Sequence, residues 1–271
     1  MEDAATPPNE QNRPELATRV GIVRFASECS LAEMTPLLDA TEPDVLKALL
    51  DNPHFGEREA LLLLNRRGLP SSVIQHLANK RTIVSNYALK LALTKHPQTP
   101  MRIALEQLKF LYLFDLVSVC LQTGVRAEVK RASEELVLAQ VPKLAVGQRI
   151  TLAKRGSGRL AANLLKGENS QIIHAVLDNP SLTEAVLLPV LNRADCCPKI
   201  VEAIACHPKW GLRYDIRLGL LRHSSLPLAR ALAILPGLKP QDAQALSQDP
   251  RVVPTVRNYL LNRVKGSQRA T

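Results

Sequence analysis

The tetrapeptide LDNP stands at residues 50–53 and again at residues 177–180, 127 positions later. At that offset, residues 44–108 align with residues 171–235 without a gap, and 19 of the 65 positions are identical. The identical residues are mostly apolar residues at helical spacing and the Asp, Asn, His and Pro residues that separate them. The chain therefore contains an internal duplication, and the duplicated element is a unit of packing.

The composition and the turn signals favour short helices. Apolar residues make up 46% of the 271 residues, whereas aromatic residues make up only 3%. In KHPQTPMRIALEQL (95–108), one helix should end before Pro97, and Pro100 suits the first position of the next. Similar signals recur along the chain and predict roughly a dozen helices of about 8–15 residues each. We therefore expect an all-α protein.

The turns recur at a regular interval. Those near Pro53, Pro97, Pro142, Pro180 and Ser224 are separated by 44, 45, 38 and 44 residues. Such a period is typical of helical solenoids, in which each unit buries its apolar face against its neighbours. The offset of the duplication then corresponds to about three such units.

Two stretches of sequence resemble a known family: LALTKHPQTPMRIALEQL (91–108) and AVLDNPSLTEAVLLPVLNRA (175–194). They resemble bacterial HEAT-like repeats and the related leucine-rich repeat variant, whose units place His-Pro or Asn-Pro turns before a Leu-rich helix. The resemblance implies a right-handed α-solenoid of HEAT-like repeats. The leucine-rich repeat variant family also has a cysteine cluster that binds an iron–sulfur centre, but only Cys29 lies in that region here, so no cluster is inferred.

We expect one helical-repeat domain at residues 14–265, between a disordered acidic tail at 1–13 and a disordered tail at 266–271. Nothing in the first twenty residues resembles a secretory signal. The most apolar run, LKFLYLFDLVSVCL (108–121), is too short to span a bilayer and contains Lys109 and Asp115, so we expect it to form a buried helix. These features predict a cytoplasmic protein without a membrane segment.

Charge is distributed unevenly along the chain. Residues 1–60 contain 12 acidic and 5 basic side chains, whereas residues 61–271 contain 13 acidic and 30 basic ones. A basic body favours phosphates or an acidic protein as the partner. Part of the positive charge has a simpler explanation, because basic residues also stabilise the last turns of helices. The acidic N-terminal residues could also fold over the basic body as an intramolecular mimic of a partner.

The stretch KWGLRYDIRLGLLRH (209–223) is predicted to form one helix. Lys209, Arg213 and Arg217 are spaced four residues apart and would make a basic stripe, with Trp210 and Tyr214 on an adjacent face. One interpretation is a solvated face above core aromatic residues. The other is a basic groove that binds a partner.

The first copy supports the second interpretation in part, since it has Thr82, Asn86 and Lys90 at the three equivalent positions. Lys90 and Arg102 would extend the basic groove. Candidate binding residues are thus Lys209, Trp210, Arg213, Tyr214, Arg217, Lys90 and Arg102.

The remaining reactive side chains form no familiar constellation. The cysteines, five in number, have neither a disulfide framework nor the paired spacing of a zinc site, and we expect Cys196, Cys197 and Cys206 to serve packing. No catalytic order of Ser, His and Asp and no glycine-rich phosphate loop can be identified. We therefore predict no catalytic residue, no cofactor and no metal.

Three functions follow as hypotheses. The first is a non-enzymatic intracellular scaffold whose basic groove engages an acidic protein partner. The second is nucleic-acid binding, which the pI near 9.6 favours and the scarcity of aromatic residues for base stacking disfavours. The third and most remote is a DNA-base glycosylase, because one family of alkylpurine glycosylases is built from HEAT-like repeats; Trp210, Tyr214 and Asp215 would be its candidate residues.

Overall fold

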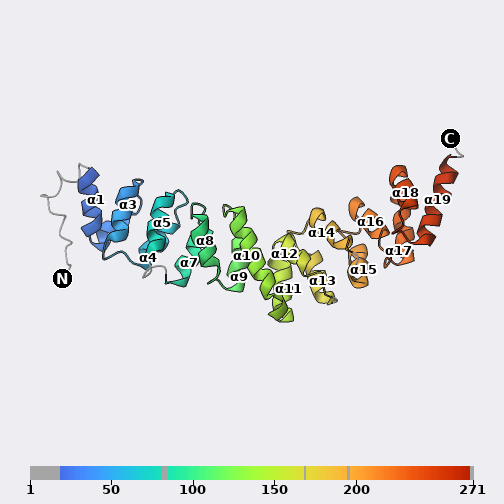
Figure 1. The fold of residues 1–271 in the computed structure, drawn as a ribbon, viewed down its shortest axis with the longest axis horizontal. Coiled ribbons are helices and arrows are strands. Elements are labelled where there is room, and N and C mark those ends of the chain that lie inside the picture. The colour runs from blue at the N-terminus through green and yellow to red at the C-terminus, as the bar shows by residue number, and fades with distance from the viewer. Residues whose placement is uncertain (1–18, 81–84, 168, 194–195, 269–271) are drawn as a thin grey trace, which may run out of the picture. The chain divides into compact units, whose positions relative to one another are not determined.

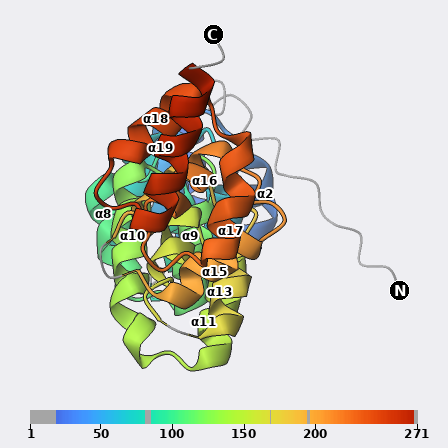
Figure 2. The ribbon, with the colours of Figure 1, turned by 90° about the vertical axis from the view of Figure 1, so that its right-hand side faces the viewer.

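The computed structural model describes residues 19–80, 85–167, 169–193 and 196–268, with side chains up to residue 262. Every regular element among these residues is a helix (Figures 1 and 2). The prediction of an all-α protein is confirmed. The tail predicted at residues 1–13 lies outside the described residues, whereas the last helix continues to Gln268, past the start of the tail predicted at 266–271.

The chain forms two compact units, Met1–Val137 (unit 1) and Leu138–Thr271 (unit 2). The α-helices of unit 1 are α1 (Arg19–Glu28), α2 (Leu31–Leu37), α3 (Pro43–Asp51), α4 (Glu57–Leu64), α5 (Ser71–Asn79), α7 (Tyr87–Lys95), α8 (Met101–Leu108), α9 (Leu113–Leu121) and α10 (Ala127–Gln140), which crosses the boundary.

The α-helices of unit 2 are α11 (Val146–Arg155), α12 (Gly158–Asn163), α13 (Ser170–Leu177), α14 (Glu184–Leu191), α15 (Pro198–Cys206), α16 (Tyr214–Leu221), α17 (Leu228–Ile234), α18 (Pro240–Gln248) and α19 (Pro254–Gln268). Two 3₁₀ turns, η3 (Val141–Lys143) and η4 (Leu235–Gly237), accompany them. Each of these α-helices begins 127 residues after an α-helix of unit 1. The duplication therefore extends far beyond residues 44–108 and relates each α-helix of unit 2 to one in unit 1.

Within each unit, helices pack against their second neighbours along the chain. In unit 1, α1 contacts α3, α3 contacts α5, α4 contacts α7, and α7 contacts α9. In unit 2, α11 contacts α13, α13 contacts α15, α12 contacts α14, and α14 contacts α16. Each apolar face is thus covered by helices that are close in sequence.

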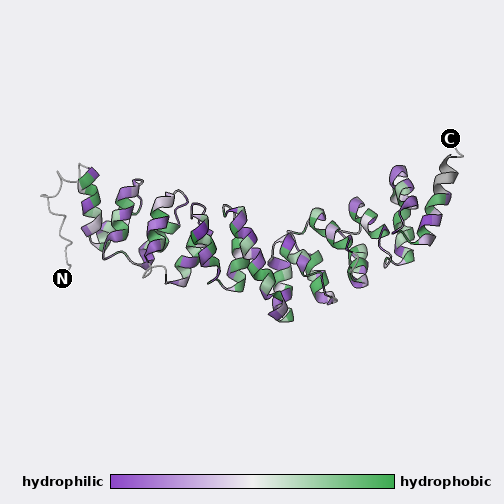
Figure 3. Ribbon diagram, viewed as in Figure 1, coloured by the Kyte–Doolittle hydropathy of each residue, from purple (hydrophilic) through white to green (hydrophobic). Residues whose placement is uncertain are grey.

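The two units bury equivalent positions. Along most helices hydrophobic and hydrophilic residues alternate around the axis (Figure 3), and the hydrophobic ones face the core. Some buried pairs are identical, such as Leu50 and Leu177, whereas others differ in size, such as Met34 and Ala161. Because burial continues where identity has been lost, the packing of the duplicated unit is retained even though its residues have changed.

A buried asparagine fixes the same turn in both units. Asn52 Nδ2 donates to the carbonyl oxygens of Ala26 (3.1 Å) and Cys29 (2.9 Å), beyond the end of α3. Its Oδ1 atom accepts a hydrogen bond from the backbone N–H of His54 at 2.8 Å. The asparagine in LDNP therefore donates to two buried carbonyl groups at the end of α1.

Asn179 repeats this arrangement in unit 2. Its Nδ2 atom donates to the carbonyl oxygens of Ala153 (2.6 Å) and Gly156 (3.0 Å), and its Oδ1 atom accepts from Ser181 N at 2.7 Å. The side chains of both asparagines are buried. The repeated tetrapeptide thus encodes a repeated contact between helices.

The helix predicted at residues 108–121 is wrong in part. Helix α8 ends at Leu108 and α9 begins only at Leu113. Phe110, Tyr112 and Phe114 around this break are exposed, with 58%, 72% and 44% of their surface accessible. A turn in this run points aromatic side chains outward, so the sequence here is only partly core.

Candidate functional site

The segment between α15 and α16 is a turn, and the prediction of one helix over 209–223 is wrong. Helix α16 begins at Tyr214. His207 Nδ1 accepts from the backbone N–H groups of Lys209 (3.2 Å) and Trp210 (3.4 Å), which closes the turn. A Cβ atom on Gly211 would lie 2.6 Å from the carbonyl oxygen of Ala205, so this turn needs a glycine.

Trp210 is a core residue. It is only 1% exposed, and its Nε1–H donates to the carbonyl oxygen of Leu177 at 2.8 Å. Lys209 covers the ring from outside, with Nζ 4.3 Å from the ring centroid. The indole is therefore not accessible for stacking on a flipped base, which the glycosylase hypothesis requires.

The other two members of the basic stripe have partners within unit 2. Arg213 precedes α16 and pairs with Glu184 Oε1 at 3.3 Å. Arg217 Nε donates to the carbonyl oxygen of Gly211 at 2.9 Å, so its side chain supports the turn. The structure brings Lys209, Arg213 and Arg217 together around one turn, where each has a structural contact.

Tyr214 belongs to a contact that occurs in both units. Its hydroxyl donates to Asp242 and accepts from the backbone N–H of Lys239 at 3.0 Å. Burial raises the pKa of Tyr214, and the hydrogen bond to Asp242 raises it further. In unit 1, Tyr87 makes the equivalent bond to Asp115. This tyrosine therefore joins neighbouring helices in both units.

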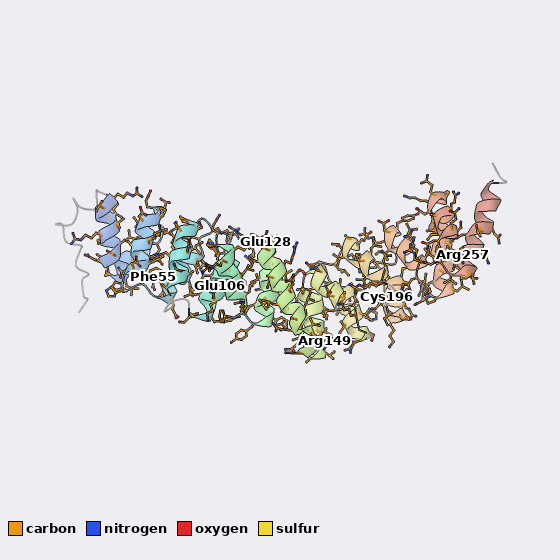
Figure 4. The ribbon with its side chains drawn as sticks, in the orientation of Figure 1. Phe55, Glu106, Glu128, Arg149, Cys196 and Arg257 are labelled. Atoms are coloured by element: carbon orange, nitrogen blue, oxygen red, sulfur yellow. The ribbon has the colours of Figure 1, made fainter. Side chains whose placement is uncertain are left out.

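Lys90 and Arg102 lie in unit 1, on α7 and α8. Lys90 Nζ is 4.6 Å from the ring centroid of Phe110. Arg102 pairs with Glu106 (labelled in Figure 4) one turn later, at 3.2 Å, and both side chains are exposed. An exposed pair of this kind contributes little to stability, so the Arg102 guanidinium stays accessible to a partner.

Sequence reasoning missed an aromatic patch in unit 1, formed by Phe110, Tyr112 and Phe114. The Tyr112 ring packs on Tyr87 with 4.7 Å between centroids, and its other side is open. Unit 2 has Gly237, Lys239 and Gln241 at the equivalent positions. The signal was present in the sequence, since three of the nine aromatic residues fall within five positions.

A groove of about 610 Å³ opens in unit 1 between α4, α7 and the turn after α9. Arg67 and Lys95 line it, and the side chain of neither makes an ion pair or hydrogen bond within the part of the chain that the structure describes. We call it groove 1; its lining residues are Leu64, Asn65, Arg67, Ala88, Leu91, Ala92, Lys95, His96, Pro97, Gln122, Thr123 and Gly124.

His96 contributes shape to groove 1 but no available polar atom. Its Nδ1 atom accepts from the backbone N–H of Gln98 at 3.2 Å, so Nε2 carries the proton and donates to the carbonyl oxygen of Arg66 at 2.8 Å. Both ring nitrogens are thereby occupied. The cations of groove 1 are Arg67 and Lys95.

Unit 2 has a carboxylate at the position equivalent to Gln122. There Asp249 accepts from Arg222 Nε (3.2 Å), from Arg251 Nε (3.1 Å) and from Arg251 Nη2 (2.9 Å). The hydrogen bonds from Arg251 lower the pKa of Asp249 to about 2. Arg222 is the counterpart of Lys95, and Arg251 is the counterpart of Gly124. We call these three residues the Asp249 cluster.

The cysteines lie apart from any cluster of ligands. Cys29, Cys120 and Cys196 (labelled in Figure 4) are buried, and Cys206 is exposed. Burial raises the pKa of Cys120 to about 11, which makes it a poor nucleophile. Among the described residues, no three His, Cys, Asp or Glu side chains are grouped so that they could hold a metal ion.

Among the described residues, no helix combines the length and the apolar character needed to cross a bilayer. No protein-family model, curated protein or solved structure matches the chain.

Proposed function

We propose that the protein is a non-enzymatic binding scaffold, a right-handed α-solenoid of HEAT-like repeats that engages an acidic protein partner. The packing of helices against their second neighbours within each unit supports the solenoid. The partner class follows from the surface charge.

The observation that carries the proposal is the charge difference between the two copies. Residues 1–137 contain 16 basic and 17 acidic side chains, a net charge of −1. Residues 138–271 contain 19 basic and 8 acidic side chains, a net charge of +11. Since both units bury equivalent positions, the fold does not require this charge. A basic surface that folding does not explain favours an acidic partner.

Half of this difference, 6 of 12 charges, lies in the first helices of each unit. Residues 19–60 carry 4 basic and 8 acidic side chains, whereas residues 146–187 carry 5 basic and 3 acidic ones. Lys154, Arg155 and Lys166 of unit 2 are exposed. Unit 1 has Ser27, Glu28 and Asp39 at the three equivalent positions.

This equivalence supplies a conservative test. Lys154→Ser, Arg155→Glu and Lys166→Asp together give unit 2 the residues that unit 1 carries on the same local backbone, so the triple variant is expected to fold. We expect it to bind a labelled polyglutamate peptide at least about fivefold more weakly than the wild type at physiological salt. Fluorescence anisotropy of the peptide with the full chain measures this.

The matched control introduces the opposite change into unit 1. Ser27→Lys, Glu28→Arg and Asp39→Lys should leave peptide binding as strong as in the wild type or strengthen it. Equal weakening in both variants would show that the substitutions act through folding. Undiminished binding by the unit 2 variant would contradict the proposal.

Single-stranded nucleic acid is the second candidate, and the aromatic patch favours it. Exposed rings near cations such as Lys90 are the elements on which bases stack. The same titration with labelled single-stranded RNA and double-stranded DNA decides between the classes. RNA binding that persists at physiological salt, without peptide binding, would place nucleic acid first.

A further inference from the structure

The two copies place different groups at one equivalent position, and this difference identifies a ligand. In unit 2, Asp249 lies beside Arg222 and only 14% of its side chain is exposed. In unit 1, the equivalent residue is Gln122, which is neutral, while Lys95 keeps the positive charge of Arg222. Unit 1 therefore retains a cation and lacks the internal carboxylate.

The surroundings in unit 1 leave room for that carboxylate to come from outside. Groove 1 measures about 610 Å³, with Lys95 and Arg67 on it and Leu91, Ala92 and Pro97 among its apolar lining. Gly124 stands where unit 2 has Arg251, so the side chain that clasps Asp249 is absent. A Cβ atom on Gly124 would have only Pro97 within 4 Å, at 3.6 Å.

Resting on the proposed function, we infer that groove 1 binds an acidic segment of the partner protein, with one Asp or Glu carboxylate at the position that Asp249 takes in unit 2. Lys95 and Arg67 hold the carboxylate, and the neighbouring apolar side chain of the segment packs on Leu91 and Pro97. Charge complementarity selects this occupant, because the cations lack an acceptor within the described residues.

A single substitution tests the inference. Gln122→Asp introduces the internal carboxylate beside Lys95, so it should compete with the ligand. We expect it to weaken binding of a labelled peptide of alternating glutamate and leucine by about tenfold. Gln122→Asn introduces a side chain of the same size as aspartate but without its charge, and this variant should bind within about twofold of the wild type. Fluorescence anisotropy with the full chain gives both values.

A second pair of variants guards against misfolding as the cause. Lys95→Met should weaken binding as strongly as Gln122→Asp does. Lys95→Arg should bind as the wild type does, because arginine holds the carboxylate in unit 2. Circular dichroism of each variant should match the wild type. A peptide in which glutamine replaces glutamate should not bind measurably.

The outcomes separate the two proposals. If the unit 2 triple variant weakens binding while Gln122→Asp and Gln122→Asn bind alike, the inference on groove 1 is wrong and the proposed function stands. If no acidic peptide binds the wild type, both are wrong. If Gln122→Asp releases single-stranded RNA and leaves peptide binding unchanged, the groove holds a phosphate and the inference is overturned.

Discussion

At the scale of single residues, Asn52 and Asn179 explain why LDNP occurs twice. Each donates to two carbonyl oxygens at the end of a neighbouring helix and accepts one backbone N–H. No other uncharged side chain of this length offers two donors and an acceptor in this geometry. The other identical asparagines, Asn65 and Asn192, are exposed, so identity between copies alone does not distinguish a structural residue from a surface one.

Removal of the side-chain amide should therefore destabilise the protein at the buried pair of asparagines and have little effect at the exposed pair. We expect Asn179→Ala to lower the free energy of unfolding by about 2–4 kcal/mol, because two buried carbonyl groups lose their donor. Asn192→Ala should change it by less than about 0.5 kcal/mol. Urea denaturation followed by circular dichroism measures both. Equal effects at the two positions would refute the role assigned to Asn179.

At the scale of elements, the positions of most helices could be predicted from the sequence, but the side chains that they expose could not. Hydrophobic periodicity and prolines located the helices because each helix buries one apolar face. The spacing of Lys209, Arg213 and Arg217 also fits a helix, but α16 begins only at Tyr214, after a turn that holds Trp210 in the core. Local pattern cannot report such a tertiary requirement. The aromatic patch was missed because residues 108–121 were interpreted as one buried helix, whereas α8 ends at Leu108 and α9 begins at Leu113.

The duplication was likewise underestimated. Identity at the 127-residue offset is dense only in residues 44–108, although equivalent helices run to both ends of the described chain. Buried pairs such as Met34 and Ala161 or Thr94 and Leu221 share burial without sharing a residue. Packing tolerates these exchanges when neighbouring side chains adjust. Groove 1 could not be predicted from the sequence, because its lining comes from three separate segments that only the fold brings together.

The junction before α12 contains a close backbone contact that can be tested. A Cβ atom on Gly158, at the start of α12, would lie 2.3 Å from the carbonyl oxygen of Ser181. We expect Gly158→Ala to lower the free energy of unfolding by about 1–3 kcal/mol because backbone must move. Gly147→Ala in α11 meets no atom within 4 Å and should raise stability by about 0.5 kcal/mol. Thermal unfolding of both variants checks the sign.

At the scale of the whole molecule, the chain joins two units with one core pattern and different charge. The predicted single domain at 14–265 stays a prediction, because compactness of each unit does not decide whether they unfold together. The buried asparagines provide a pair of matched perturbations for that question. Asn52 belongs to unit 1 and Asn179 to unit 2.

We expect each substitution to loosen its own unit. With Asn52→Ala, amide hydrogen exchange measured by mass spectrometry should accelerate in peptides from residues 19–137 and stay unchanged in those from 138–268. Asn179→Ala should produce the reverse. Acceleration in both regions by either variant would indicate one cooperative domain, as the sequence predicted.

The constant offset of 127 has a genetic consequence. Because no residue has been inserted or deleted between equivalent helices, an unequal crossover between the two halves of the coding sequence stays in frame and in helical register. Joining any position of unit 1 to its counterpart in unit 2 would leave a chain of 144 residues in which every helix keeps its usual successor. The reciprocal product would carry a third copy. The number of copies can therefore change by recombination without a new junction between helices.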